Sequence, residues 1–154
     1  MPEFLLQCQG TIHTLSTPWI MGVLNSTPDS FYAGSRLNAP QEAAERARAM
    51  LTSGARIIDI GGYSSRPGAD PVTPEQEWNR LKEVIPAVAE VLNDFPGSFI
   101  SVDTFRADIA DKALLAGAHW INDISGGNLD PEIFNVAATH RCPYIIMHMQ
   151  GDPS

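Results

Sequence analysis

Amide and carboxylate side chains recur at one place in the sequence pattern, the end of a short apolar run. The polar residues at the ends of the five runs are Asn25, Asp59, Asp103, Asn122 with Asp123, and His148. A carboxylate in a water-poor pocket can accept two parallel hydrogen bonds from a heterocycle with adjacent N–H donors. A neutral amide oxygen, such as that of Asn25, suits Mg²⁺ that is held chiefly by diphosphate and water. The pattern therefore predicts one shared ligand site.

Each of these residues also has a structural interpretation. An Asp that follows a strand often caps the next helix, and Asp103 with Thr104 is placed to do so. His148, between Met147 and Met149, is compatible with either the site or simple packing. The recurrence at five successive run ends favours a shared site over five separate caps.

Two long irregular stretches each follow an apolar run directly, at residues 27–39 and 61–72. Long loops in compact domains are usually functional or disordered, so both stretches are candidate active-site loops. The second stretch carries Ser65 and Arg66 just before Pro67 and Gly68, so a hydroxyl and a guanidinium are available to close over an anion or an aromatic carboxylate. The alternative is an ordinary solvated surface loop.

The apolar runs themselves are short and rich in Ile and Val, which is typical of parallel strands that are buried on both faces. They cover residues 19–24, 56–60, 99–102, 119–124 and 144–147. Amphipathic helical patterns lie between them; one opens with a capping box at Thr73 and contains Pro86, which predicts a kink. Two alternating segments at 4–8 and 11–15 precede the first run and predict a β-hairpin.

Strands that alternate with helices predict βαβ units in an α/β fold. Five strands fit a flavodoxin-like open sheet, and they also fit just over half of a (β/α)8 TIM barrel, whose usual length is about 250 residues. In both folds ligands bind at the carboxyl ends of the strands. The pattern alone leaves both folds open, and it predicts one domain over residues 1–154.

Composition excludes several classes of partner. The formal charge is −8 with only ten Lys and Arg residues, so we expect neither nucleic-acid nor membrane-surface binding. No apolar run approaches the roughly 18 residues that span a bilayer. Cys8 and Cys142 have no metal-type spacing, and the first residues do not resemble a signal peptide, so we expect a cytoplasmic protein.

Five segments carry a family resemblance. They are MGVLNSTPDSF at 21–31, DIGGYSSRPGA at 59–69, SVDTF at 101–105, INDISGG at 121–127 and MHMQGDP at 147–153. In order and spacing they resemble the successive motifs of the dihydropteroate synthases, a family of pterin-binding enzymes. The resemblance runs through most of the chain. It implies that residues 1–154 form the N-terminal part of a (β/α)8 barrel whose C-terminal strands are missing.

The activity that the resemblance implies belongs to folate biosynthesis. Enzymes of this family condense 4-aminobenzoate with (7,8-dihydropterin-6-yl)methyl diphosphate to give 7,8-dihydropteroate and diphosphate, with Mg²⁺, and sulfonamides compete for the aminobenzoate position. Two alternatives stay open: a folate-dependent methyltransferase pterin-binding domain, and a non-catalytic pterin-binding fragment.

By motif position, the resemblance assigns roles to individual residues. Asn25 would bind Mg²⁺ and diphosphate, Asp103 and Asn122 would hold the pterin edge, and Asp59 would support them. Ser65 and Arg66, from the loop that closes around diphosphate and aminobenzoate, would be catalytic together with Asp103. Met147 would be a further substrate contact, and Asp29 with Phe31 would belong to the other loop.

Some features depart from the family pattern. Tyr63 stands where the family usually has Glu, and Ser65 where it usually has Thr. The family continues into later motifs that supply a Lys, an Arg and a His, and this chain has none of those motifs. We therefore expect the chain alone to be inactive or nearly so. An incomplete barrel also has open strand edges, so we expect self-association or flattening of the sheet.

Overall fold

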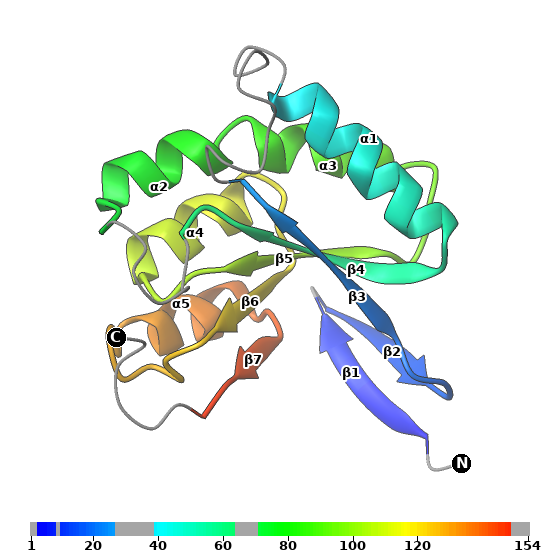
Figure 1. Ribbon diagram of the computed structural model, residues 1–154. Helices are drawn as coiled ribbons and strands as arrows, with labels where there is room; N and C mark the ends of the chain where they lie inside the picture. Colours follow the sequence, from blue (N-terminus) through cyan, green and yellow to red (C-terminus); the bar gives the residue numbers. More distant parts are fainter. Residues whose placement is uncertain (1–2, 9, 27–38, 64–70, 149–154) are drawn as a thin grey trace.

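A hairpin and a five-stranded parallel sheet form the framework of the molecule (Figure 1). The computed structural model describes residues 3–8, 10–26, 39–63 and 71–148. The hairpin strands are β1 (Phe4–Cys8) and β2 (Thr11–Leu15); the sheet consists of β3 (Ile20–Asn25), β4 (Ala55–Gly61), β5 (Phe99–Asp103), β6 (Trp120–Asp123) and β7 (Tyr144–Ile146). The helices are α1 (Ala39–Thr52), α2 (Pro74–Leu81), α3 (Val84–Leu92), α4 (Ala107–Leu115) and α5 (Ile133–His140).

The strand order decides between the two predicted folds. The sheet runs β3-β4-β5-β6-β7, with every neighbouring pair parallel and consecutive in the chain. In a flavodoxin-like sheet the strand order reverses at a switch point, and helices cover both faces of the sheet. Here the helices cover one face and the sheet curves away from them (Figure 1). The flavodoxin-like alternative is therefore wrong, and the fold is the N-terminal portion of a (β/α)8 barrel.

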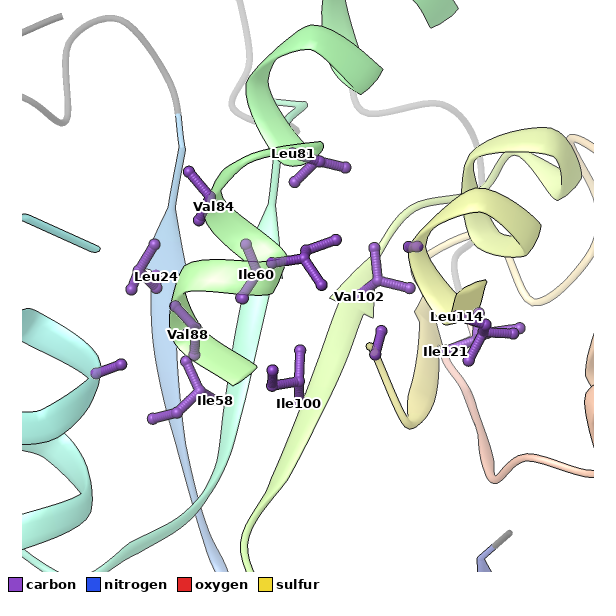
Figure 2. Packing of buried hydrophobic residues seen from close by; sticks show 14 of the residues in the cluster. Leu24, Ile58, Ile60, Leu81, Val84, Val88, Ile100, Val102, Leu114 and Ile121 are labelled. Atoms are coloured by element: carbon purple, nitrogen blue, oxygen red, sulfur yellow. The ribbon is translucent and has the colours of Figure 1, made fainter. Parts of the chain in front are cut away.

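Side chains alternate between the two faces of each strand, because successive Cβ atoms point in opposite directions. We call the side toward the helices the helix face; its strand residues are Leu24, Ile58, Ile60, Ile100, Val102 and Ile121, all fully buried. Figure 2 shows them packed with Leu81, Val84, Val88 and Leu114 of the helices. This apolar layer is the main core of the protein.

We call the opposite side of the sheet the inner face, and the hairpin covers its amino end. Cys8 of β1 packs with Ile57, Phe99 and Trp120, and Leu6, Trp19, Met21 and Ile145 surround them. The rings of Trp19 and Phe99 are stacked with centroids 5.6 Å apart, and Phe99 lies 5.6 Å from Trp120. The predicted hairpin is confirmed, and it forms an apolar floor under the inner face.

The local sequence predicts two helix features: a capping box at Thr73 and a kink caused by Pro86. Thr73 caps α2, since Gln76 N donates to Thr73 Oγ1 and Thr73 N donates to Gln76 Oε1. Pro86 lacks the N–H that would bond the Lys82 carbonyl, and the predicted kink is a break between α2 and α3 at residues 82–83. None of the helices in the described part of the chain has the length and apolar character that crossing a membrane requires.

Candidate functional site

The carboxyl ends of the strands bring together most of the polar residues that the sequence pattern predicts; His148, just after β7, is exposed. Asn25 pairs in register with Gly61, Gly61 with Asp103, and Asp103 with Asn122. Partners in register share a face, so these four residues form one row on the inner face, which we call the strand-end row. A Cβ atom on Gly61 would lie 3.3 Å from Asp103 Oδ2 and 3.7 Å from Asn25 Oδ1. A side chain at position 61 would therefore contact both the Asp103 carboxylate and the Asn25 amide.

A second polar layer lies one step deeper. Asp59 pairs in register with Ser101, and Ser101 with Trp120. Asn122 Nδ2 donates to Asp59 Oδ2 over 3.0 Å, which links the two layers. Four buried atoms of these layers have no hydrogen-bond partner among the described residues: Asp59 Oδ1, Ser101 Oγ, Trp120 Nε1 and Asn122 Oδ1.

Orphan polar atoms of this kind need an explanation, because buried polar groups in native proteins are nearly always hydrogen-bonded. On the helix face nearly every buried strand residue is apolar, so the orphans gather on the inner face. Two of the four are acceptors only, the Asp59 carboxylate and the Asn122 amide oxygen. The inner face is thus equipped to receive a ligand rich in N–H donors.

Several carboxylates crowd the same region. Burial raises the pKa of Asp103 to about 7, and the negative charges of Asp59, Glu77 and Asp123 add to the effect. Burial also raises the pKa of Asp59, and the hydrogen bond from the Asn122 amide acts against this rise. A ligand that donates hydrogen bonds would stabilise the charged forms that the protein alone disfavours. The electrostatics therefore favour the same kind of ligand as the geometry.

Asp123, which the sequence pattern does not separate from Asn122, has a different role. It points to the other side of β6, where its carboxylate accepts from the Ser125 and Gly127 amides over 2.7 Å each and from the Tyr144 hydroxyl over 2.5 Å. These partners lie in the turn after β6 and in β7, and none of them is part of the strand-end row. Asp123 shapes the turn after β6 and attaches β7, and it does not belong to the site.

The other predicted site residues divide into two groups. Met147 follows β7 and its amide donates to the Asp123 carbonyl, while its side chain is 43% exposed. It lies beyond the end of the strand that neighbours Asn122. Ser65 and Arg66, like Asp29 and Phe31, lie outside the described residues.

Sequence reasoning missed two features. Ser101 could have been found, because a hydroxyl inside the apolar run 99–102 shares the period of Asp103. Glu77 gives no such signal, since it looks like an ordinary charge on an amphipathic helix. In the structure it is fully buried, accepts from Thr104 Oγ1 over 2.7 Å and forms an ion pair with Arg106. Its partners lie far away in the sequence.

The described residues hold no group of three or more His, Cys, Asp or Glu side chains that would bind a metal ion by itself.

Comparison with known proteins identifies the family. The sequence pattern of the family described as pterin binding enzyme matches residues 21–154. The chain belongs to this family.

Individual relatives of the chain are named dihydropteroate synthase. Dihydropteroate synthase of Synechocystis is 48% identical over 135 residues, which are 88% of this chain and 45% of that protein. Dihydropteroate synthase of Bacillus subtilis is 46% identical over 129 residues, 84% of this chain and 44% of that protein. The chain thus spans about half the length of the curated relatives it matches.

Solved structures of the family have the same fold. The dihydropteroate synthase of Xanthomonas albilineans with 4-aminobenzoic acid superposes with a TM-score of 0.84 at 36% identity, over 97% of this chain and 53% of that one. A sulfonamide drug complex of the Yersinia pestis enzyme gives 0.81 at 40% identity, over 98% and 53%. The predicted family and barrel fold are confirmed.

Proposed function

We propose that this chain supplies the pterin-binding part of a dihydropteroate synthase. That activity condenses 4-aminobenzoate with (7,8-dihydropterin-6-yl)methyl diphosphate to give 7,8-dihydropteroate and diphosphate. The observation that carries the proposal is the set of orphan buried acceptors beside Asp103. The relatives named dihydropteroate synthase and the solved complex with 4-aminobenzoic acid support it.

The donor pattern of a pterin complements these acceptors. Its 2-amino group and the adjacent ring N–H form a donor edge that a single carboxylate can accept in parallel, and Asp103 is placed for this. The NH₂ group of Asn122 donates to Asp59. Its carbonyl oxygen has no partner among the described residues, so it can accept a hydrogen bond from a ligand. In this arrangement Asp59 fixes the orientation of the Asn122 amide, which would otherwise be free to flip.

The diphosphate end would lie at the other end of the strand-end row. Asn25 Oδ1 is a neutral hard oxygen beside Gly61, and it fits one ligand position of Mg²⁺. Since the described residues offer no further ligand cluster, diphosphate and water would complete the coordination. The bound ion would stabilise the charge that develops on the leaving diphosphate. Ser65, Arg66 and Met147 are proposed contacts of the two substrates.

A second candidate is pterin binding without turnover by this chain alone. The neighbouring charges that raise the pKa of Asp103 are those of Asp59, Glu77 and Asp123, and these carboxylates would repel a diphosphate. Orientation and electrostatic stabilisation of the leaving group are the main tasks of a protein in such a displacement. Binding would then survive where catalysis does not.

Self-association is also part of the proposal. The edge strands β3 and β7 each pair on one side only in the described sheet, and they expose Ile20, Val23 and Ile146. Open edges with apolar side chains are templates for pairing with another chain. We expect a second copy to cover them, and sedimentation velocity that yields only monomer across a hundredfold concentration range would contradict this. A cytoplasmic location completes the proposal; one pea relative is named as mitochondrial.

The deciding experiment measures binding and turnover separately. Binding of the dihydropterin substrate is followed by calorimetry, and product formation is assayed with both substrates and Mg²⁺, for this chain and for Asp103→Ala. Binding and turnover that both disappear in the variant would support the synthase and would contradict the expected inactivity of the chain alone. Binding that the variant abolishes, without turnover in either protein, would favour the second candidate. Absence of binding in the parent chain would overturn both.

A further inference from the structure

Helix α2 contacts the three chain segments that leave β3, β4 and β5. Ser26 Oγ donates to the Arg80 carbonyl over 2.9 Å, and Arg80 Nη1 donates to the Gly62 carbonyl over 2.8 Å. Thr104 Oγ1 donates to Glu77 Oε1 over 2.7 Å. One short helix thereby holds the exits of three neighbouring strands.

Each residue held by α2 is the immediate chain neighbour of a strand-end row residue. Ser26 follows Asn25, Gly62 follows Gly61, and Thr104 follows Asp103. Backbone hydrogen bonds join the same residues across the sheet, since Ser26 N donates to the Gly61 carbonyl over 2.7 Å and Thr104 N to the Asn122 carbonyl over 3.0 Å. A shift of α2 would therefore be transmitted to the spacing of the row.

A further link is the ion pair of Glu77 on α2 with Arg106, which follows β5. The Glu77 side chain is fully buried and that of Arg106 is 18% exposed. Arg106 Nη1 donates to Glu77 Oε2, and Arg106 Nη2 donates to the Val72 carbonyl over 2.8 Å. The guanidinium also lies over the rings of Phe105 and Tyr63, 4.6 and 5.4 Å from their centroids. Tyr63 leads directly from Gly62, so the stack adds a further link to the exit of β4.

We propose that Glu77 and Arg106 are positioning residues, whose ion pair fixes α2 and thereby sets the spacing of Asn25, Gly61 and Asp103 for the pterin. This inference rests on the proposed function. A buried carboxylate without its cation is strongly unfavourable, so loss of Arg106 drives Glu77 toward water and moves α2. The row then loses its spacing although none of its own residues has changed.

The experiment uses three variants and a matched control. Arg106→Met removes the cation, Glu77→Gln with Arg106→Met removes both charges, and Arg106→Lys keeps a cation but loses the planar fork. Arg48→Met is the control, because Arg48 also pairs with a carboxylate, Asp94, and lies over a ring, Phe95, but is half exposed and far from the row. Binding of 6-hydroxymethylpterin is measured by fluorescence titration, and amide hydrogen exchange is measured without ligand.

We expect Arg106→Met to weaken pterin binding about tenfold or more and to accelerate exchange at the Ser26 and Thr104 amides. The double variant should recover most of the affinity, Arg106→Lys should lie between, and Arg48→Met should match the parent chain. Should Arg106→Met fail to fold, Arg106→Lys and the double variant carry the same comparison with the control.

Two results would overturn the inference: unchanged affinity and exchange in Arg106→Met, or faster exchange spread equally over the whole sheet, which marks a merely stabilising pair. The exchange measurement needs no pterin. Failure of the parent chain to bind pterin would therefore remove the proposed function while the positioning role is still tested.

Discussion

The two faces of the same strands differ in what they do with buried groups. On β5, Ile100 points to the helix face and lies among apolar side chains, whereas its neighbour Ser101 points to the inner face and has no hydrogen-bond partner among the described residues. Both are fully buried. The period of two in a strand thus separates residues that stabilise the protein from residues that are proposed to bind the ligand, within a single run of five residues.

The inner face is itself divided along the strands. Its amino end is apolar where the hairpin covers it, and its carboxyl end carries the polar layers. The helix face shows no such gradient in β4 and β5, where Ile58, Ile60, Ile100 and Val102 are apolar along the whole length. A comparison of neighbouring residues is therefore the sharpest way to test whether stability and binding are separate.

The largest effect should come from the helix face. Ile100→Ala removes fully buried methyl groups and leaves a cavity, and we expect a loss of about 4 kcal/mol in the free energy of unfolding. Pterin affinity of the folded fraction should stay unchanged. Urea denaturation and a binding titration well below the unfolding midpoint check this. A large loss of affinity at full folding would show that the two faces are not independent.

Asp103 should make stability depend on pH. Its pKa is 3.8 as an ordinary Asp and about 7 in the folded protein. Between these values the folded state holds a proton that the unfolded state has released, so raising the pH through this window favours unfolding. Asp103→Asn removes the dependence. Relative to the parent chain, the variant should gain about 3 kcal/mol in stability between pH 4 and pH 8.

Denaturation of both proteins across that pH range measures the difference. If the two stability curves run parallel, the carboxyl of Asp103 titrates normally and the crowding of carboxylates at the site has no consequence. Pterin binding to the parent chain should tighten with rising pH over the same window, since the ligand donates to the carboxylate.

Gly61→Ala should separate binding from stability. The added Cβ would fill the space between Asp103 and Asn25, with the nearest atom 3.3 Å away. Since Gly61 lies in a regular strand, we expect stability to change by less than about 1 kcal/mol. Pterin affinity should fall about tenfold, because the new methyl group would lie between the two side chains that are proposed to contact the substrate and Mg²⁺. Equal affinity in a titration would place the ligand elsewhere.

The smallest effect should come from Ser101→Ala, the inner-face counterpart of Ile100→Ala. The hydroxyl has no hydrogen-bond partner among the described residues, so its removal leaves none of them unsatisfied, and stability should change by less than about 1 kcal/mol, with either sign. Thermal unfolding of the two neighbouring variants side by side gives the contrast directly. A loss as large as that of Ile100→Ala would mean that Ser101 makes a hydrogen bond essential to the fold.

Much of the fold follows from local patterns. The alternation in residues 4–8 and 11–15 and the capping box at Thr73 act over a few residues, and both predictions are confirmed. Pro86 also acts locally, but in place of the predicted kink the structure has a break between two helices. The choice between barrel and open sheet does not follow, because it depends on which strands pair. That choice was settled by the consecutive strand order, and at the sequence level only the family resemblance favoured one fold.

The site is predictable where it depends on strand ends and unpredictable where it depends on distant partners. Asn25, Asp59, Asp103 and Asn122 meet because parallel strands end at one edge of the sheet. Glu77 was missed because its burial depends on Arg106, 29 residues away, and no local pattern reveals an ion pair of that separation. The proposed roles of Ser65 and Arg66 stay predictions from the resemblance.

The apolar floor also gives the molecule an optical readout of its own. Trp19 and Trp120 both lie there, stacked or tilted against Phe99, and Trp120 pairs in register with Ser101 of the polar layer. The fluorescence of these two tryptophans should change when the hairpin detaches from the amino end of the inner face. It should also change when an absorbing heterocycle binds at the carboxyl end. The third tryptophan, Trp78, lies on α2 near Lys112 and can be replaced to leave only the two floor residues as the source of the signal.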